Sequence, residues 1–340
     1  MSARTKISDD EKLERAARLA IKKYLHKKHP SPRDAWRTIS PHPVHNVVGV
    51  SVGRKRVGKE TTSTPCIRIY VRHKFLLPRG SKFALKKEFG GFPTDIIAVG
   101  TPRRMANDGT LDLKRARPAY PGCWVTAEPP TEISFPMPGT FGAVLEDENG
   151  VLYILSNNHV LANEGQNSKG DLVYQPINES PNKIAKLAAV IPLNRSGANK
   201  VDCALAKVIQ TKDVTGVLPD PIGQLTSTSP LDPQVGMKVE KFGATTGHTI
   251  GTVIGTNATF KVDYTTAPGL LLVDQIQIEN GDGDFCGHGD SGSLVVDVET
   301  KQAVGLLTVN MDGFALANRL SNVIAVLSTK LGSQLQLKIS

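Results

Sequence analysis

Residues 286–294 read Cys286-Gly287-His288-Gly289-Asp290-Ser291-Gly292-Ser293-Leu294 and lead into an apolar, strand-like run that continues to Val296. The glycines allow positive φ angles and let another molecule approach the main chain closely. Such a turn presents a serine, Ser291, and can aim neighbouring N–H groups at one point, as stabilisation of an oxyanion requires. Because Gly, Asp and Ser are also ordinary turn residues, the turn indicates chemistry only if a base and an orienting acid accompany it.

A histidine and an aspartate upstream of this turn fit those two roles. The apolar run 151–155 predicts a strand, and His159 follows at the end of that strand. Asp202 stands directly before a second apolar run, 203–206. The chain order His159, Asp202, Ser291 differs from the order in subtilisin-like and α/β-hydrolase triads.

At these positions the sequence resembles the trypsin-like (chymotrypsin-fold) serine proteases, over residues 137–325. Residues 289–292 match the Gly-Asp-Ser-Gly motif of that family, His159 matches its histidine, and Asp202 matches its Asp-hydrophobic-Ala pattern. The resemblance implies a triad of His159, Asp202 and Ser291, with an oxyanion hole formed by the N–H groups of Gly289 and Ser291. It therefore implies a serine endopeptidase that cleaves protein substrates through an acyl-enzyme and needs no cofactor.

Three departures from the family pattern narrow the resemblance. Val160 stands where many secreted members carry a disulfide cysteine, and Ser293 stands where the animal enzymes have a second glycine. Both changes point toward bacterial intracellular members. No Ile-Val-Gly-Gly-like start lies near Gly139 to provide a partner for Asp290, so either another group satisfies this acid or activation is conformational.

The resemblance also suggests a substrate pocket. Its floor would be Phe285, and its wall strand would be Thr308, Val309 and Asn310. An aromatic floor favours a shallow or apolar pocket. A shift of one residue would place Asp284 at the floor and reverse that preference, so specificity stays open.

Other reactive side chains are weaker candidates for the chemistry. His288 and His248 could replace His159 as the base, but neither has an acid in the Asp-hydrophobic-Ala context. Cys286 is interpreted as a small buried hydrophobe rather than as a nucleophile. The histidines and carboxylates show no short ligand spacing, so we expect no metal site.

The resemblance implies a mainly β fold, a chymotrypsin-like double β-barrel preceded by a smaller N-terminal α+β domain and an N-terminal helix. From residue 139 onward, short apolar runs are separated by turn residues at intervals near ten, which is typical of a sandwich or barrel. We expect a trypsin-like protease domain over residues 119–340. It would contain two six-stranded barrels, over about 139–210 and about 235–320, and a final helix over about 321–331 that is capped by Ser321.

The N-terminal third has a different pattern. Ser8 and Glu11 form a capping-box sequence that starts a basic amphipathic helix reaching about Lys28, within residues 1–30. Apolar runs predict three strands of an α+β accessory domain over residues 45–118. These strands are expected over 46–53, 66–72 and 93–100, with proline-rich linkers over 30–44 and 103–138.

The charge is divided unevenly between these parts. Of 41 Lys+Arg and 32 Asp+Glu, residues 1–118 hold 27 and 10, a net charge of +17, and the remaining 14 and 22 give −8. A basic segment can attract nucleic acid or an acidic partner, or it can dock on an acidic neighbouring domain. The second function class is therefore a catalytically silent protease-fold scaffold whose basic N-terminal region binds nucleic acid or an acidic protein.

Location and control follow from other features. No apolar stretch approaches the roughly 18 residues of a membrane span, and the start of the chain lacks a secretory apolar core, so we expect a cytoplasmic protein without membrane association. The four cysteines are far apart, which argues against disulfides. The glycine-rich turn and the oppositely charged parts predict an enzyme that rests with a misformed oxyanion hole or a covered cleft, until a partner or self-assembly activates it.

Overall fold

A computed structural model of the chain describes residues 8–26, 40–58, 60–104, 114–129, 138–280 and 284–339. Most of the first predicted linker and parts of the second, residues 105–113 and 130–137, lie outside the described residues. Strands dominate, and they form two large sheets beside an N-terminal helix. The prediction of a mainly β fold with an N-terminal helix is confirmed. Within the described residues, no helix is both long enough and apolar enough to cross a membrane.

The first barrel closes because one chain segment pairs on both of its edges. Residues 139–147 form two short strands in succession, of which β7 pairs with β6 and β8 pairs with β9. Between them, Phe141 N–H donates to Cys123 O at 2.9 Å and Gly142 N–H donates to Leu155 O at 2.9 Å, which continues both pairings. The ring is then completed by β10, β11 and β13. Its strands are β6 (Trp124–Ala127), β7 (Gly139–Thr140), β8 (Ala143–Asp147), β9 (Leu152–Ser156), β10 (Leu172–Tyr174), β11 (Lys183–Val190) and β13 (Ala204–Val208).

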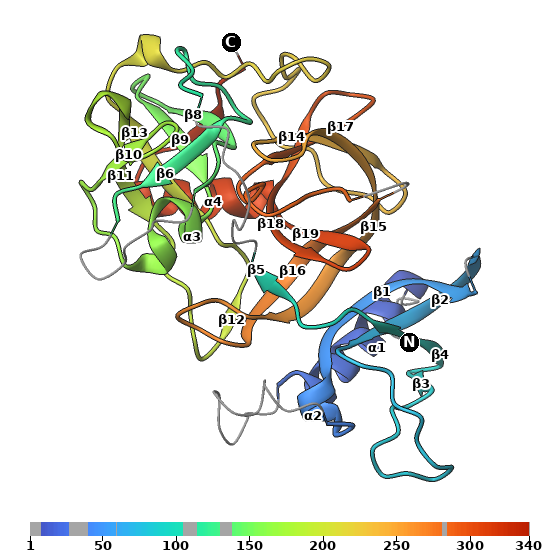
Figure 1. Cartoon of the computed structure of the whole chain (residues 1–340). Coiled ribbons are helices and arrows are strands. Elements are labelled where there is room, and N and C mark those ends of the chain that lie inside the picture. Colours follow the sequence, from blue (N-terminus) through green and yellow to red (C-terminus); the bar gives the residue numbers. More distant parts are fainter. Residues whose placement is uncertain are drawn as a thin grey trace, which may run out of the picture.

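The second barrel is a closed antiparallel ring, and it lies beside the first (Figure 1). Each strand pairs with two neighbours, in the order β14-β15-β16-β19-β18-β17 and back to β14. Apolar side chains such as Val253 and Ile278 fill the interior. The strands are β14 (Lys238–Gly243), β15 (Gly247–Val262), β16 (Leu270–Asn280), β17 (Leu294–Asp297), β18 (Ala303–Met311) and β19 (Phe314–Arg319).

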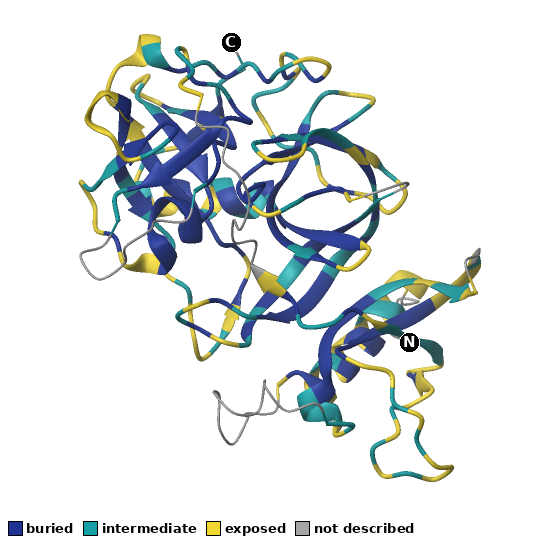
Figure 2. Ribbon diagram, in the orientation of Figure 1, coloured by how far each residue is buried: buried dark blue, intermediate teal, exposed yellow. Residues whose placement is uncertain are grey.

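A third apolar cluster joins the two barrels. It combines residues of β8 and β9 with residues of β17, β18 and the last helix, α4 (Leu320–Leu331). After α4, a short strand, β20 (Leu335–Leu337), returns to pair with β8 of the first barrel. Figure 2 shows the result, with buried residues throughout both barrels and exposed residues mainly in the outer loops. The remaining short elements are α3 (Asn158–Leu161), η1 (Asn163–Gly165), η2 (Ser180–Asn182), β12 (Ala198–Asn199) and η3 (Thr211–Asp213).

The N-terminal part is a small sheet covered on one face by a helix. Ala16, Ala20 and Tyr24 of that helix pack on Ile67 and Ile69 of the sheet. The opposite face is covered as well, because Val48 and Tyr70 pack with Phe260 of the second barrel. The elements are α1 (Asp9–Tyr24), α2 (Pro43–Asn46), β1 (Val47–Val57), β2 (Glu60–Val71), β3 (Glu88–Phe89) and β4 (Phe92–Ala98).

This N-terminal module is joined to the second barrel by a continuous sheet. Strand β1 pairs antiparallel with β15, with Gly49 opposite Phe260. A Cβ at Gly49 would lie 2.2 Å from Phe260 Cε1, so only glycine allows this approach. Tyr70 OH donates to Gln277 Oε1 at 2.9 Å across the same boundary. These contacts favour the interpretation that the basic N-terminal part docks on the acidic remainder of the chain.

Three local predictions need correction. The capping box of Ser8 and Glu11 is confirmed, but α1 ends at Tyr24 rather than near Lys28, because the N–H groups of the next two residues both return to Ile21 O and close the turn. The stretch predicted as a linker contains β6, which the first barrel needs to close. Helix α4 begins at Leu320 with Arg319 as N-cap rather than Ser321, because β19 runs directly into it.

Candidate active site

His159 and Asp202 are brought together by two adjacent strands of the first barrel. His159 lies in α3, directly after β9, and Asp202 lies just before β13. Because β9 and β13 pair with Ser156 opposite Ala204, the end of one strand lies beside the start of the other. His159 Nδ1 lies 2.6 Å from Asp202 Oδ2, and the backbone N–H of His159 donates to Asp202 Oδ1 at 3.2 Å. The family resemblance implied this pairing, although the two residues are 43 positions apart in the sequence.

The environment of Asp202 keeps its carboxyl ionised. Burial raises the pKa of Asp202, but the electrostatic interaction with His159 and hydrogen bonds from His159 and Tyr264 outweigh it and leave the pKa below its usual value. Asp202 has no exposed surface, and His159 is 1% exposed. A buried carboxylate held in this way fixes the imidazole with its Nδ1 protonated and its Nε2 as the acceptor.

Ser291 lies on the predicted tight turn, and its two flanking glycines are required there. Gly289 and Gly292 have φ angles of 97° and 92°. A Cβ on Gly289 would lie 2.3 Å from Trp124 Cη2, and one on Gly292 would lie 2.0 Å from Ser156 Oγ. The turn is therefore packed tightly against the first barrel. Thr140 N–H donates to Ser291 O at 2.8 Å and fixes that contact.

In this structure Ser291 and His159 are not hydrogen-bonded to each other. Ser291 Oγ is 3.5 Å from Thr308 O, a long contact, and His159 Nε2 is buried without a hydrogen-bond partner among the described residues. A buried imidazole nitrogen that lacks a partner is costly, so it indicates a group that a serine hydroxyl or a ligand would satisfy. Hydrogen bonds between catalytic groups are often long before substrate binds.

Two main-chain N–H groups of the turn are left open in the described part of the chain. Within the described residues, the N–H groups of Gly289 and Ser291 donate no hydrogen bond, whereas the neighbouring Gly292 N–H donates to Leu307 O at 2.9 Å. The carbonyl of His288, which shares a peptide group with the Gly289 N–H, accepts from Thr245 Oγ1 at 2.5 Å, and this bond holds that peptide group.

Asp290 is satisfied by a buried lysine. Lys241 Nζ lies 3.0 Å from Asp290 Oδ2, and neither side chain is exposed. Asp290 Oδ2 also accepts from Gly287 N–H at 3.0 Å, and its Oδ1 accepts from Thr245 N–H at 2.9 Å. Burial lowers the pKa of Lys241, while the Asp290 carboxylate opposes that change. The question that the sequence left open, which group meets this acid, is answered by Lys241 of β14.

The residues predicted for the substrate pocket lie on both sides of the turn. Phe285 is 2% exposed and packs in the core of the second barrel, where its ring faces Lys241 Nζ. Asp284 is exposed. Thr308 and Val309 are buried in β18, and Asn310 Nδ2 donates to Cys286 O at 2.9 Å.

The competing groups lie in other environments. His248 Nε2 is 2.8 Å from Glu240 Oε2, and His288 is exposed on the turn itself. Cys66, Cys123, Cys203 and Cys286 are all free and buried, as expected from their spacing. Burial raises the pKa of the Cys286 thiol, which disfavours the thiolate that a nucleophile requires.

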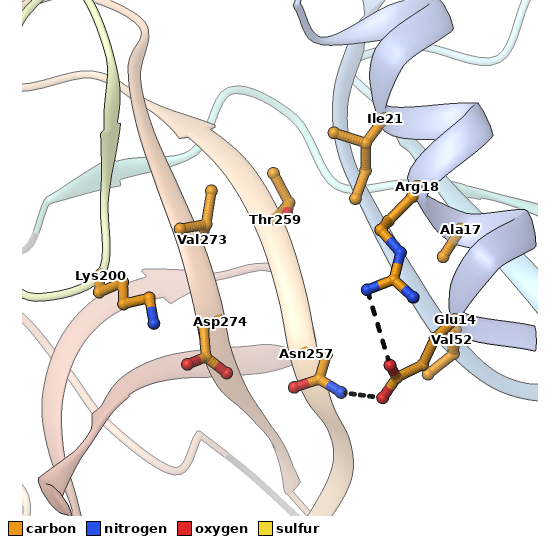
Figure 3. Close-up of a pocket in the computed structure, with 10 residues that line it drawn as sticks. All are labelled: Glu14, Ala17, Arg18, Ile21, Val52, Lys200, Asn257, Thr259, Val273 and Asp274. Carbon is orange, nitrogen blue, oxygen red and sulfur yellow. Dashed lines mark hydrogen bonds and ion pairs between the residues drawn. The ribbon is translucent and has the colours of Figure 1, made fainter. Parts of the chain in front are cut away.

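A cavity of about 380 Å³ lies between α1 and the second barrel (Figure 3), and His159, Asp202 and Ser291 are not among the residues that line it. Glu14 of α1 accepts a hydrogen bond from Asn257 Nδ2 at 2.8 Å, and it pairs with Arg18 on its own helix. The cavity is lined by no histidine, cysteine or serine. We therefore describe it as part of the contact between the N-terminal module and the barrel.

Two residues at the site were missed from the sequence. Lys241 carried no clear signal, because its strand reads Lys-Val-Glu-Lys-Phe-Gly and places the apolar Val239 and Phe242 on opposite faces. Tyr264, whose OH donates to Asp202 Oδ2 at 2.7 Å, follows the end of β15 and carried no pattern that links it to the triad.

Solved structures to which the chain is similar are bacterial serine proteases. Thermobifida fusca protease A is 16% identical, with 65% of this chain and 100% of that chain covered and a TM-score of 0.45. For Nocardiopsis protease the identity is 17%, the coverage 65% and 100%, and the TM-score 0.44. A glutamic acid specific serine protease is 15% identical, with coverage of 64% and 100% and a TM-score of 0.46. No protein-family model and no curated protein matches the sequence. These similarities cover about two thirds of this chain.

Proposed function

We propose that the protein is a serine endopeptidase in which His159, Asp202 and Ser291 form the catalytic triad. The observation that supports this most directly is the buried pair of His159 and Asp202, 2.6 Å apart, which leaves His159 Nε2 without a partner. A general base needs this combination of a fixed tautomer and an open acceptor nitrogen.

In the proposed reaction, Ser291 Oγ leaves Thr308 O and donates its proton to His159 Nε2 as it attacks the substrate carbonyl. The oxyanion accepts hydrogen bonds from the N–H groups of Gly289 and Ser291. His159 then donates the proton to the leaving amine, and water releases the acyl group by the same path. Asp202 stabilises the imidazolium that forms and stays ionised throughout.

A fluorophosphonate probe tests this proposal. It should label wild-type protein on Ser291, identified by peptide mass spectrometry, and labelling should be lost in Ser291→Ala. The exposed Ser229 gives the control, since Ser229→Ala should be labelled at the wild-type rate. A folded wild-type protein that is never labelled would instead favour the silent scaffold with a basic, nucleic-acid-binding or acidic-partner-binding N-terminal region.

We propose further that the N-terminal part restrains the enzyme by covering the cleft. Strand β5 (Arg103–Arg104) pairs antiparallel with Val309 and Asn310 of β18 (Figure 1). β19 pairs with one edge of these two residues, and the pairing of β17 with β18 reaches only to Leu306. β5 therefore takes the other edge, next to Thr308 and Ser291. An extended substrate adds to a sheet through such an edge.

The other side of this segment is also held. Asp263 N–H donates to Pro102 O at 2.9 Å, and the backbones of Arg103 and Asp263 form an isolated parallel β-bridge. The segment therefore lies in a slot between β18 and the end of β15. Ser291 and His159 are each 1% exposed, which fits a covered cleft rather than an open one.

Breaking this pairing is expected to speed reaction with a peptide probe. Arg103→Pro with Arg104→Pro removes two backbone donors and disfavours an edge strand. A peptidyl phosphonate, which needs the β18 edge, should then react on the order of tenfold faster, the value of one or two hydrogen bonds. The small fluorophosphonate should react at the wild-type rate.

The double alanine variant, Arg103→Ala with Arg104→Ala, is the matched control because it keeps the backbone pairing. It should react with both probes as wild type does. An unchanged peptidyl phosphonate rate in a folded proline variant would refute restraint by β5 while leaving the proposed triad intact.

The remaining parts of the proposal concern place and partners. The four free, buried thiols support a reducing, cytoplasmic location in a bacterial cell. The docked N-terminal module supports control by a protein partner or by self-assembly, which would displace β5 from the cleft. Narrow, regulatory specificity would follow from a cleft that opens only on such a signal.

A further inference from the structure

We propose that Tyr264 is a positioning residue for Asp202, and that Glu164 holds the loop of Tyr264 from across the cleft. The inference rests on the proposed function, because it assigns a role in supporting the base His159. It concerns residues on two barrels that meet at the triad.

The contact between Tyr264 and Asp202 is short and buried. Tyr264 OH donates to Asp202 Oδ2 at 2.7 Å, and this is the same oxygen that lies 2.6 Å from His159 Nδ1. Tyr264 is 2% exposed. Its ring stands edge-on to the imidazole, with ring centroids 6.0 Å apart and an interplanar angle of 76°. One side chain thus bonds the carboxylate and forms a wall beside the imidazole.

No other hydroxyl among the described residues donates to this carboxylate. The nearby Thr308 Oγ1 donates to Leu306 O at 3.2 Å and accepts from Asn157 Nδ2 at 3.2 Å. Apart from Tyr264, the carboxylate accepts only from the N–H and the ring of His159 within the described part of the chain. The tyrosine therefore provides the one donor that is independent of the base itself.

Glu164 links the loop of Tyr264 to the first barrel. Its Oε1 accepts from Thr265 N–H at 2.9 Å and its Oε2 accepts from Thr266 N–H at 2.7 Å. Hydrogen bonds to an ionised carboxylate are stronger than those between neutral groups. Glu164 has a φ angle of 59° and is 8% exposed. A non-glycine residue keeps such a backbone conformation only where its surroundings hold it.

The main chain of Asp202 is held from the second barrel as well. Its N–H donates to Asn318 Oδ1 at 2.8 Å, and Asn318 belongs to β19. Both the backbone and the carboxylate of Asp202 are thus bonded to the second barrel. The orientation of His159 consequently depends on how the two barrels meet. Tyr264 contributes to this because it bonds Asp202 Oδ2, the oxygen that also bonds His159 Nδ1.

Tyr264→Phe tests the positioning role because it removes only the hydroxyl. We expect fluorophosphonate labelling of Ser291 to slow about tenfold, the effect of losing one hydrogen bond to an ion. The low-field proton NMR signal of His159 Nδ1–H should move further downfield, since Asp202 Oδ2 loses its competing donor and becomes a stronger acceptor.

Tyr153→Phe is the matched control. Tyr153 is also a buried tyrosine, 5% exposed, and its OH donates to a carboxylate, Asp147 Oδ2, at 3.0 Å. This variant should lose a similar amount of thermal stability while both the labelling rate and the His159 signal stay at their wild-type values.

Glu164→Gln tests the second half of the proposal. The amide keeps the size of the side chain but accepts only one of the two N–H groups well, so the same two readouts should change in the same direction by a smaller factor. A folded Tyr264→Phe protein with a wild-type labelling rate and an unmoved signal would overturn the inference. The NMR readout needs no turnover. If the wild-type protein is never labelled but the His159 signal still moves in Tyr264→Phe, the result would count against the proposed function alone.

Discussion

Asp202→Asn is expected to slow the labelling of Ser291 by a fluorophosphonate about 10⁴-fold without unfolding the protein. The amide has nearly the same shape as the carboxylate, but its NH₂ group would donate to His159 Nδ1. That reversal moves the imidazole proton to Nε2, where the base must accept. The rate of labelling and the thermal unfolding midpoint, measured on the same samples, check both halves of the expectation.

Asp147→Asn provides the control for this substitution. Asp147 is a buried carboxylate of the first barrel that accepts from the N–H groups of Asn149 and Val151, each at 2.9 Å. Its amide variant should keep the wild-type labelling rate. His159→Ala should abolish labelling in parallel with Asp202→Asn. If His159→Ala were labelled normally and His288→Ala were not, the assignment of the base would be wrong.

Lys241→Met is expected to lower the free energy of unfolding by about 3–5 kcal/mol, because it leaves the buried Asp290 carboxylate without its counter-charge. The cost is large since Lys241 Nζ is 3.0 Å from Asp290 Oδ2 in a site without solvent exposure. Asp290 also fixes Gly287 N–H of the turn, so labelling of Ser291 should slow as well. Urea unfolding and the labelling rate below the transition measure the two effects.

An exposed ion pair supplies the comparison for Lys241. Lys12 and Asp9 of α1 are 2.7 Å apart, but their side chains are 54% and 89% exposed. Lys12→Met should therefore change stability by less than about 1 kcal/mol. The double variant Lys241→Met with Asp290→Asn removes the unpaired charge and should recover part of the lost stability. A single Lys241→Met variant as stable as wild type would show that the buried pair is not needed.

Much of the site could be predicted because its motifs are local. The glycines around Ser291 are required by positive φ angles within one turn, and the sequence shows them directly. His159 and Asp202 each stand at a strand boundary, so their meeting follows once the two strands pair. The capping box at Ser8 is likewise a relation between residues three positions apart.

The rest could not be predicted because it depends on contacts between distant segments. Tyr264 and Asp202 are 62 positions apart, and Glu164 and Thr265 are 101 apart. Nothing near Tyr264 marks it as a donor to a carboxylate. Strand β5 is too short to show a period of its own, and it forms only because the edge of β18 is available. Lys241 was also missed, because the sequence of β14 shows no apolar alternation that would mark its inward position.

Strand β15 combines three contacts that give it a mechanical role. Gly247, at its start, accepts from Lys241 Nζ at 3.1 Å, close to Asp290. Phe260, near its end, faces Gly49 of the N-terminal module. Tyr264 follows its end and bonds Asp202. β15 thus connects a support of the turn that carries Ser291 with a support of Asp202, and register shifts against β16 between Val253 and Phe260 bend the strand between these two ends. A displacement of the N-terminal module would therefore act on β15 close to the end that precedes Tyr264, and so on Asp202 before it acts on the turn of Ser291.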